Sequence, residues 1–84
     1  MLTVRFEPSA LKKLNHLDAS LRQRILEKVR ELESFPACRA DVKKLHGADN
    51  AFRLRVGGWR IIFAVYRDIN ELVIFDLDTR GRIY

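Results

Sequence analysis

The sequence predicts an α+β fold: a small, mainly antiparallel β-sheet that carries an N-terminal antiparallel helix pair on one face, in the order β-α-α-β-β-β. Two observations lead to this class. Apolar residues recur at spacings of three and four between residues 11 and 32, which is typical of amphipathic helices. Residues 52–77 instead hold three short segments of apolar and β-branched residues separated by turn residues, which is typical of paired strands.

The first half of the chain predicts one strand and two helices. Residues 2–6 alternate like a strand, and Pro8 then suits the first position of a helix, where its missing N–H costs nothing. Asp18 is a favourable N-cap for a second helix, and Pro36 ends it. The apolar stripe of the first helix is expected to contain Leu11, Leu14 and Leu17, and that of the second Leu21, Ile25, Val29 and Leu32.

The second half predicts a hairpin and a closing strand. Residues 37–50 form a connector without a clear period, and Gly57-Gly58 then suits a two-residue hairpin turn. In that register Arg55 stands opposite Arg60. Residues 67–70 form a turn, and residues 72–77 pair with residues 61–66. Because the segment from 59 to 66 is apolar on both faces beyond its arginine, we expect it to be the central strand.

Three arginines share one face of the predicted hairpin. Arg53 and Arg55 alternate with apolar residues, and Arg60 follows the turn on the same face. Like charges directly opposite each other destabilise a sheet. The arrangement is therefore best explained by an anionic ligand, and guanidinium groups match the geometry of phosphate in RNA or DNA. A solvated polar face paired with Asp76 or Asp78 is the alternative.

Composition narrows the class of protein. The chain has 84 residues with a formal net charge of +5, and all six basic residues after position 50 are arginine, which favours an acidic partner. Residues 1–84 are expected to form a single domain. The single cysteine, Cys38, excludes an internal disulfide and a cysteine-based metal site, and we expect a cytoplasmic protein. No apolar run approaches the roughly 20 residues that cross a membrane, and neither a metal nor another cofactor is expected.

The order of several motifs resembles the RelE/ParE superfamily of toxins. The opening residues 6–17, the connector Lys43-Lys44-Leu45-x-Gly47, the hairpin from Phe52 to Phe63 and the ending from Thr79 to Tyr84 carry the resemblance over nearly the whole chain. It implies a toxin of a type II toxin–antitoxin system that a cognate antitoxin neutralises. In the RelE-like branch the toxin cuts mRNA in the ribosomal A site, whereas in the ParE-like branch it inhibits DNA gyrase and cuts no RNA.

The resemblance also assigns roles to residues. It implies that Arg60, Arg80 and Tyr84 are catalytic and that Arg53 and Arg55 bind the RNA. Apart from the resemblance, the basic pair Lys43 and Lys44 is expected to contact RNA phosphate, with an ordinary solvated surface as the alternative. The reaction would be attack of a ribose 2′-OH on the adjacent phosphate, with cations stabilising the charge that develops on the phosphate oxygens.

Two departures from the RNA-cutting relatives leave the general base open. Thr79 stands where many of them have histidine, and both basic residues of the first hairpin strand are arginine, which is a poor base. His46 is interpreted as an ordinary surface residue. We expect a ribosome-dependent mRNA endonuclease; a gyrase inhibitor, or an inactive relative that only binds its antitoxin or RNA, is the alternative.

Overall fold

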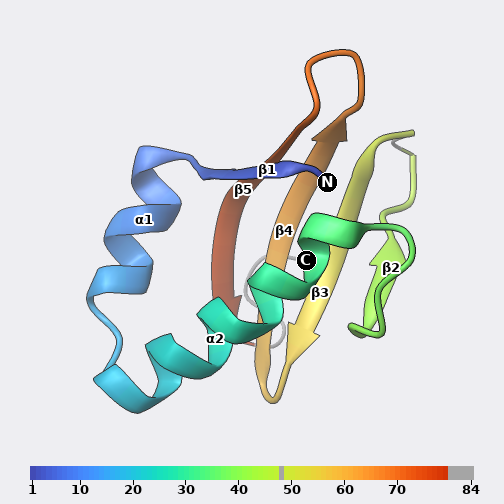
Figure 1. The fold of residues 1–84 in the computed structure, drawn as a ribbon. Helices are drawn as coiled ribbons and strands as arrows, with labels where there is room; N and C mark the ends of the chain where they lie inside the picture. Colours follow the sequence, from blue (N-terminus) through green and yellow to red (C-terminus); the bar gives the residue numbers. More distant parts are fainter. Residues whose placement is uncertain (48, 80–84) are drawn as a thin grey trace.

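A computed structural model describes residues 1–47 and 49–79. Five strands form one sheet in the order β1-β5-β4-β3-β2, with both α-helices on the same side (Figure 1). Neighbouring strands are antiparallel, except for the parallel pair β1 and β5. The elements are β1 (Thr3–Phe6), α1 (Pro8–Asn15), α2 (Ala19–Glu31), the 3₁₀ turn η1 (Leu32–Ser34), β2 (Val42–Lys44), β3 (Ala51–Val56), β4 (Trp59–Tyr66) and β5 (Glu71–Thr79).

The hairpin of β3 and β4 has the register that the sequence predicts. Val56 pairs with Trp59 and Arg55 pairs with Arg60. Gly57 adopts φ +60° at the first position of the turn, whereas the φ of Gly58 is not in the left-handed region. A positive φ at only the first central residue is the pattern of a type II′ turn, whose twist matches that of the flanking strands. The two glycines are therefore not equivalent.

Strand β4 is the central strand of the sheet, as its apolar character on both faces predicts. Its pairing with β5 runs from Trp59 opposite Thr79 to Tyr66 opposite Glu71, with a shift in register between Ile62 and Phe63. The shift leaves Phe75 without a partner on β4 and 38% exposed. Such a bulge bends the strand and increases its local twist.

The two helices cover different strands of the sheet. Helix α1 lies against β5, and α2 crosses toward β3 (Figure 1). The predicted cap of α2 is confirmed, because the Asp18 carboxylate accepts a hydrogen bond from the backbone N–H of Leu21 at 3.3 Å. The prediction of a buried Leu11 is wrong: that side chain is 43% exposed, and the side chains of α1 that are buried are those of Ala10 and Leu14.

The hydrophobic core lies between the helices and the sheet. Leu54, Ile61 and Leu77 occupy matching positions on three neighbouring strands and are fully buried. At the other end of this layer, Phe63 stacks on Phe52 at 5.5 Å between ring centroids, and Phe35 meets both rings edge to face. The other face of the hairpin, which carries the arginines, is thereby left without a helical cover.

The connector predicted to lack a regular period contains the edge strand β2 and the loop that leads into β3. Val42 pairs with Leu54 and Lys43 pairs with Arg53, so β2 extends the hairpin by one strand. The backbone N–H of Leu45 donates to the carbonyl of Ala51 at 2.9 Å, which closes the loop. Across the described ranges 1–47 and 49–79, helices long and apolar enough to cross a membrane are absent.

Candidate functional site

A cleft of about 450 Å³ opens on the side of the sheet that carries the arginines. We call it the basic cleft. Among the described residues that line it, five are lysine or arginine and none is a carboxylate. Its lining consists of Lys43, Lys44, Leu45, His46, Arg53, Arg55 and Arg60. A concave surface with this much positive charge attracts anions and raises their local concentration.

Three adjacent strands supply the cations. Arg53 and Arg55 point to the same side of β3 because they are two residues apart, and Arg60 joins them from β4 because it pairs with Arg55. Lys43 joins from β2, opposite Arg53. The sheet therefore fixes the backbone positions of four cations from three segments of the chain.

Arg53 is the most deeply placed of these cations. The residue is only 7% exposed, and its Nη1 atom is buried without a hydrogen-bond partner. The one ion pair described for it is a contact of 3.9 Å from Nη1 to the Asp41 carboxylate, whose side chain is 61% exposed. Burying an incompletely paired guanidinium costs stability, so the position is unfavourable for folding alone and favourable for holding an anion.

Arg55 and Arg60 face each other directly across the hairpin. Arg55 is exposed and Arg60 is half-buried, so the Arg55 side chain has more freedom to reach toward a ligand. On its other side Arg60 pairs in register with Asp78 of β5. The two guanidinium groups can therefore bind one phosphate from neighbouring strands, with Arg60 held in place more firmly.

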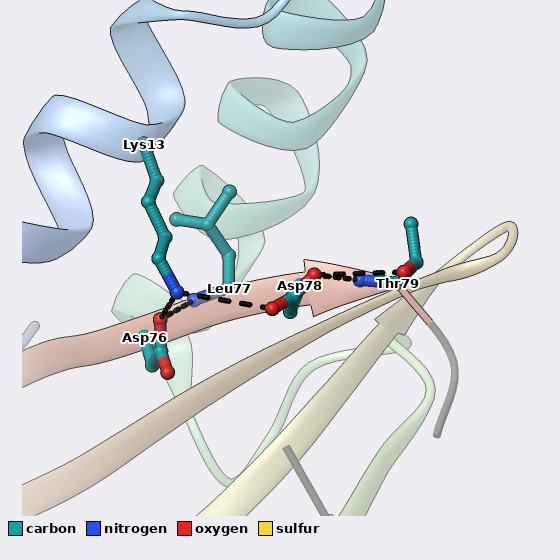
Figure 2. A network of polar contacts seen from close by, with 5 residues as sticks. All are labelled: Lys13, Asp76, Leu77, Asp78 and Thr79. Atoms are coloured by element: carbon teal, nitrogen blue, oxygen red, sulfur yellow. Dashed lines mark hydrogen bonds and ion pairs between the residues drawn. The ribbon is translucent and has the colours of Figure 1, made fainter. Parts of the chain in front are cut away.

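A polar network ties helix α1 to the end of β5 beside Arg60. The Lys13 ammonium lies 2.7 Å from the Asp76 carboxylate and 3.8 Å from the Asp78 carboxylate (Figure 2). Asp78 also accepts a hydrogen bond from the backbone N–H of Thr79 at 2.7 Å. The network holds the end of strand β5 against helix α1. It also engages both aspartates that the sequence suggested as partners of the arginine face.

The other predicted site residues fall into two groups. Lys43 and Lys44 both line the basic cleft. Lys44 pairs in register with Phe52, so it lies on the opposite face of β2 from Lys43. It also borders a second hollow, which the Phe52 ring lines as well. Arg80 and Tyr84 lie outside the described residues. The structure thus brings Lys43, Lys44, Arg53, Arg55 and Arg60 together and does not describe the remaining two predicted residues.

Two aromatic residues of the hairpin lie on the face opposite the arginines. Phe52 and Trp59 are half-buried and pack against the hydrophobic core on the helix side. Neither lines the basic cleft, so base stacking there would need another ring. Within the described part of the chain, no three histidine, cysteine or carboxylate side chains lie close enough to hold a metal ion.

His46 lines the basic cleft, whereas the sequence alone predicts an ordinary surface residue. It follows β2 by two positions and lines the same hollow as Arg53, Arg55 and Arg60. The sequence signal was its position one residue before Gly47, which adopts φ +83° and turns the chain. A glycine at this position indicates a turn. The turn lies next to the arginines because β2 pairs with β3.

Comparison with known proteins gives consistent similarities. Residues 4–84 match the family model described as ParE toxin of type II toxin-antitoxin system, parDE. The toxin RelE3 of Methanocaldococcus jannaschii is 33% identical over 70 residues, which are 80% of each chain. The residues that the family model matches include all those that line the basic cleft.

Solved structures show the same architecture. The RelE–RelB complex of Pyrococcus horikoshii OT3 contains a chain that is 32% identical, with a TM-score of 0.81, over 96% of this chain and 97% of that one. The isolated Escherichia coli RelE toxin has a TM-score of 0.82 over 100% of this chain and 92% of that one. At 20% identity, the second similarity shows the fold alone.

Proposed function

The chain belongs to the RelE/ParE superfamily of type II toxins, in the RelE-like branch, and we propose that it inhibits translation by cutting mRNA on the ribosome. The observation that carries this proposal is the basic cleft, in which Arg53, Arg55 and Arg60 converge from two strands. A phosphodiester backbone is the ligand that matches such a row of guanidinium groups. Its reaction also needs the electrostatic stabilisation that they provide.

The proposed reaction is an internal transfer at one phosphate of the mRNA. The ribose 2′-oxygen attacks the adjacent phosphorus and loses its proton, and the bond from phosphorus to the 5′-oxygen of the next nucleotide breaks. The 5′-oxygen takes up a proton, so the products are a 2′,3′-cyclic phosphate and a 5′-hydroxyl. Negative charge grows on the phosphate oxygens in the transition state, where fixed cations lower the barrier more than mobile water does.

The roles of the cations follow from their positions. Arg60 stands in the central strand, half-buried and opposite Arg55, and stabilises the transition state. Arg53 and Arg55 bind and orient the RNA backbone, with Lys43 and Lys44 extending the positively charged track along β2. Arg80 is proposed as a second catalytic cation, and Tyr84 as a ring that stacks on a base or assists proton transfer.

We also propose a hetero-oligomer with a cognate antitoxin in the cytoplasm, where the ribosomes are. Several solved relatives are complexes of RelE with RelB, including those of Pyrococcus horikoshii and Methanococcus jannaschii. A basic surface that attracts RNA also attracts an acidic polypeptide segment. Binding of the antitoxin across the basic cleft would therefore exclude mRNA from the arginines.

Inhibition of DNA gyrase is the second candidate function. It is favoured by the family model that matches residues 4–84, whose description names a ParE toxin. In that case the arginines would form a binding surface without chemistry, and substitution of Arg60 would not stop a cleavage reaction.

Cell-free translation of a defined mRNA, followed by primer extension, tests the proposal. The wild-type protein is expected to produce new RNA ends within codons only when ribosomes are present. Arg60→Ala should lose this activity, whereas Arg30→Ala, which removes an exposed arginine from α2, should keep it. Intact mRNA together with inhibited supercoiling by gyrase would overturn the proposal in favour of the second candidate.

A further inference from the structure

We propose that His46 is the general base of the basic cleft and accepts the proton of the attacking 2′-hydroxyl. The inference rests on the proposed function, because it assigns one step of the same reaction. It supplies a group that the arginines of the cleft do not provide, because arginine does not give up its proton in proteins.

The backbone places His46 at one end of the row of cations. Strand β2 ends at Lys44, and the hydrogen bond from the Leu45 N–H to the Ala51 carbonyl holds the loop against the start of β3. His46 follows immediately and lines the basic cleft together with Arg53 and Arg60. The ring is exposed, so a substrate can reach it without a rearrangement of the core.

Side-chain chemistry separates His46 from the rest of the lining. The other polar side chains described there belong to lysine and arginine, residue types that ordinarily carry their protons at neutral pH and act as donors. Leu45 has no group that can accept a proton. Imidazole is the side chain that ordinarily exchanges its proton between pH 5 and 8 and is the commonest general base in enzymes.

Every proton that is released in the proposed step is taken up by a named group. A neutral imidazole nitrogen takes the 2′-OH proton as the new bond from oxygen to phosphorus forms. The bond to the 5′-oxygen breaks, and that oxygen takes a proton from a water molecule. The resulting hydroxide is neutralised by the proton on the imidazolium, which restores His46. Arg55 and Arg60 stabilise the phosphate charge and do not exchange protons.

Charged groups surround this position from every neighbouring element. Lys43 and Lys44 lie on β2, Arg53 and Arg55 on β3 and Arg60 on β4. The carboxylate of Asp49 borders a second hollow that His46 shares with Lys44. An effect of pH on the cleavage rate is therefore assigned to His46 only if substitution of this histidine alone removes it.

The test compares the two histidines of the chain. His46→Gln removes the base, and His16→Gln makes the same change on α1, where the ring contacts the Lys12 carbonyl away from the basic cleft. Single-turnover cleavage of ribosome-bound mRNA is measured from pH 5.5 to 8.5. Loss of a general base typically lowers the rate about 10²–10⁴-fold. We expect this loss for His46→Gln, with mRNA affinity within about threefold of wild type and no rise in rate with pH on the acidic side.

A second substrate distinguishes a base from an acid. Replacing the scissile 5′-oxygen by sulfur gives a leaving group that needs no proton. This substrate therefore restores the cleavage rate of a variant that lacks the general acid. It does not restore the rate of a variant that lacks the general base. His46→Gln should stay slow on this substrate.

Each outcome separates this inference from the proposed function. No cleavage by the wild-type protein would contradict both. Wild-type cleavage with an unchanged rate and pH profile in His46→Gln would overturn only the role of His46, and so would rescue by the sulfur substrate. Unchanged circular dichroism and unchanged antitoxin binding show that the variant is folded.

Discussion

Arg53 is a single residue whose burial is unfavourable for stability. Its side chain is buried, its Nη1 lacks a hydrogen bond, and its nearest described carboxylate lies 3.9 Å away on an exposed side chain. A well-packed apolar residue avoids the cost of burying such a charge. The proposed binding of an anion would account for an arginine at this position.

Replacing Arg53 by Met should separate the two effects. We expect Arg53→Met to leave the free energy of unfolding unchanged or to raise it by about 1–2 kcal/mol, because the buried charge and its unpaired donor are removed. RNA cleavage should fall in the same variant. Urea denaturation followed by circular dichroism measures the first quantity, and the translation assay measures the second.

Arg55→Met is the matched control, because Arg55 is exposed two positions along the same strand. A change in its free energy of unfolding within about 0.5 kcal/mol is expected for such a surface position. A loss of more than about 2 kcal/mol in Arg53→Met would contradict the account, because it would mean that the guanidinium serves the fold.

At the scale of elements, the hairpin turn sets the pairing of the arginines. Gly57 has φ +60°, and a Cβ built there would lie 3.3 Å from the Nη2 atom of Arg24. Gly58 has neither a positive φ nor a close neighbour: beyond its adjoining residues, no atom lies within 4 Å of a Cβ built at that position. The two neighbouring glycines therefore offer a matched pair of substitutions.

Gly57→Ala should lower the free energy of unfolding by about 1–2 kcal/mol, because an L-residue is strained in the left-handed region. For a domain of this size, that corresponds to a fall in Tm of roughly 4–16 °C. Gly58→Ala should change the free energy by less than about 0.5 kcal/mol. Equal effects in thermal melts would show that the turn differs from the one described.

The ion pairs of Lys13 connect α1 with β5 (Figure 2). Because the Lys13 side chain is 47% exposed, solvent screens the contacts, and Lys13→Met should lower the free energy of unfolding by no more than about 1 kcal/mol. The loss should shrink in 1 M salt, where surface ion pairs are screened.

Lys12→Met, on the same helix, is the comparison, because no ion pair is described for Lys12. A salt-independent loss above about 2 kcal/mol in Lys13→Met would contradict a screened surface network. Urea denaturation at low and high salt measures both variants.

The local parts of this fold could be predicted from the sequence, and its non-local parts could not. Strict alternation and a Gly-Gly turn determine the register of β3 with β4, and an aspartate before an apolar stripe determines the start of α2. Strand β2 was missed because its three residues, Val42-Lys43-Lys44, are too few to show alternation. The shift beside Phe75 depends on packing between strands, which no local pattern in the sequence records.

The same distinction applies to the site. Arg53, Arg55 and Arg60 could be grouped from the sequence because one hairpin carries them all. His46 could not, because its place in the basic cleft depends on the edge strand that was missed. Arg80 and Tyr84 remain predictions from the resemblance and lie outside the described residues.

At the scale of the whole molecule, charge and shape separate two faces. Both helices lie on one side of the sheet (Figure 1), where they cover the hydrophobic core. The basic cleft is lined from the side of the hairpin that carries the arginines. Five of the 16 lysine and arginine residues behind the formal net charge of +5 line this one hollow. Binding of RNA to this surface should release counterions and depend strongly on salt.

The affinity of the free protein for a single-stranded oligoribonucleotide should follow this expectation. If all five cations of the cleft contact phosphate, the slope of log K against log salt reaches about −3.5, and each cation removed reduces it by about 0.7. Arg55→Ala should therefore flatten the slope, whereas Arg30→Ala should not. Fluorescence anisotropy between 50 and 300 mM KCl measures it, and equal slopes in the two variants would place the RNA elsewhere.

The most direct test of the central claim is the chemistry of the RNA ends produced on a ribosome programmed with a defined mRNA. The proposed cleavage mechanism predicts fragments with a 2′,3′-cyclic phosphate and a 5′-hydroxyl from the wild-type protein, and at least 100-fold fewer from Arg60→Ala. Uncut mRNA, or fragments that carry a 5′-phosphate, would contradict it.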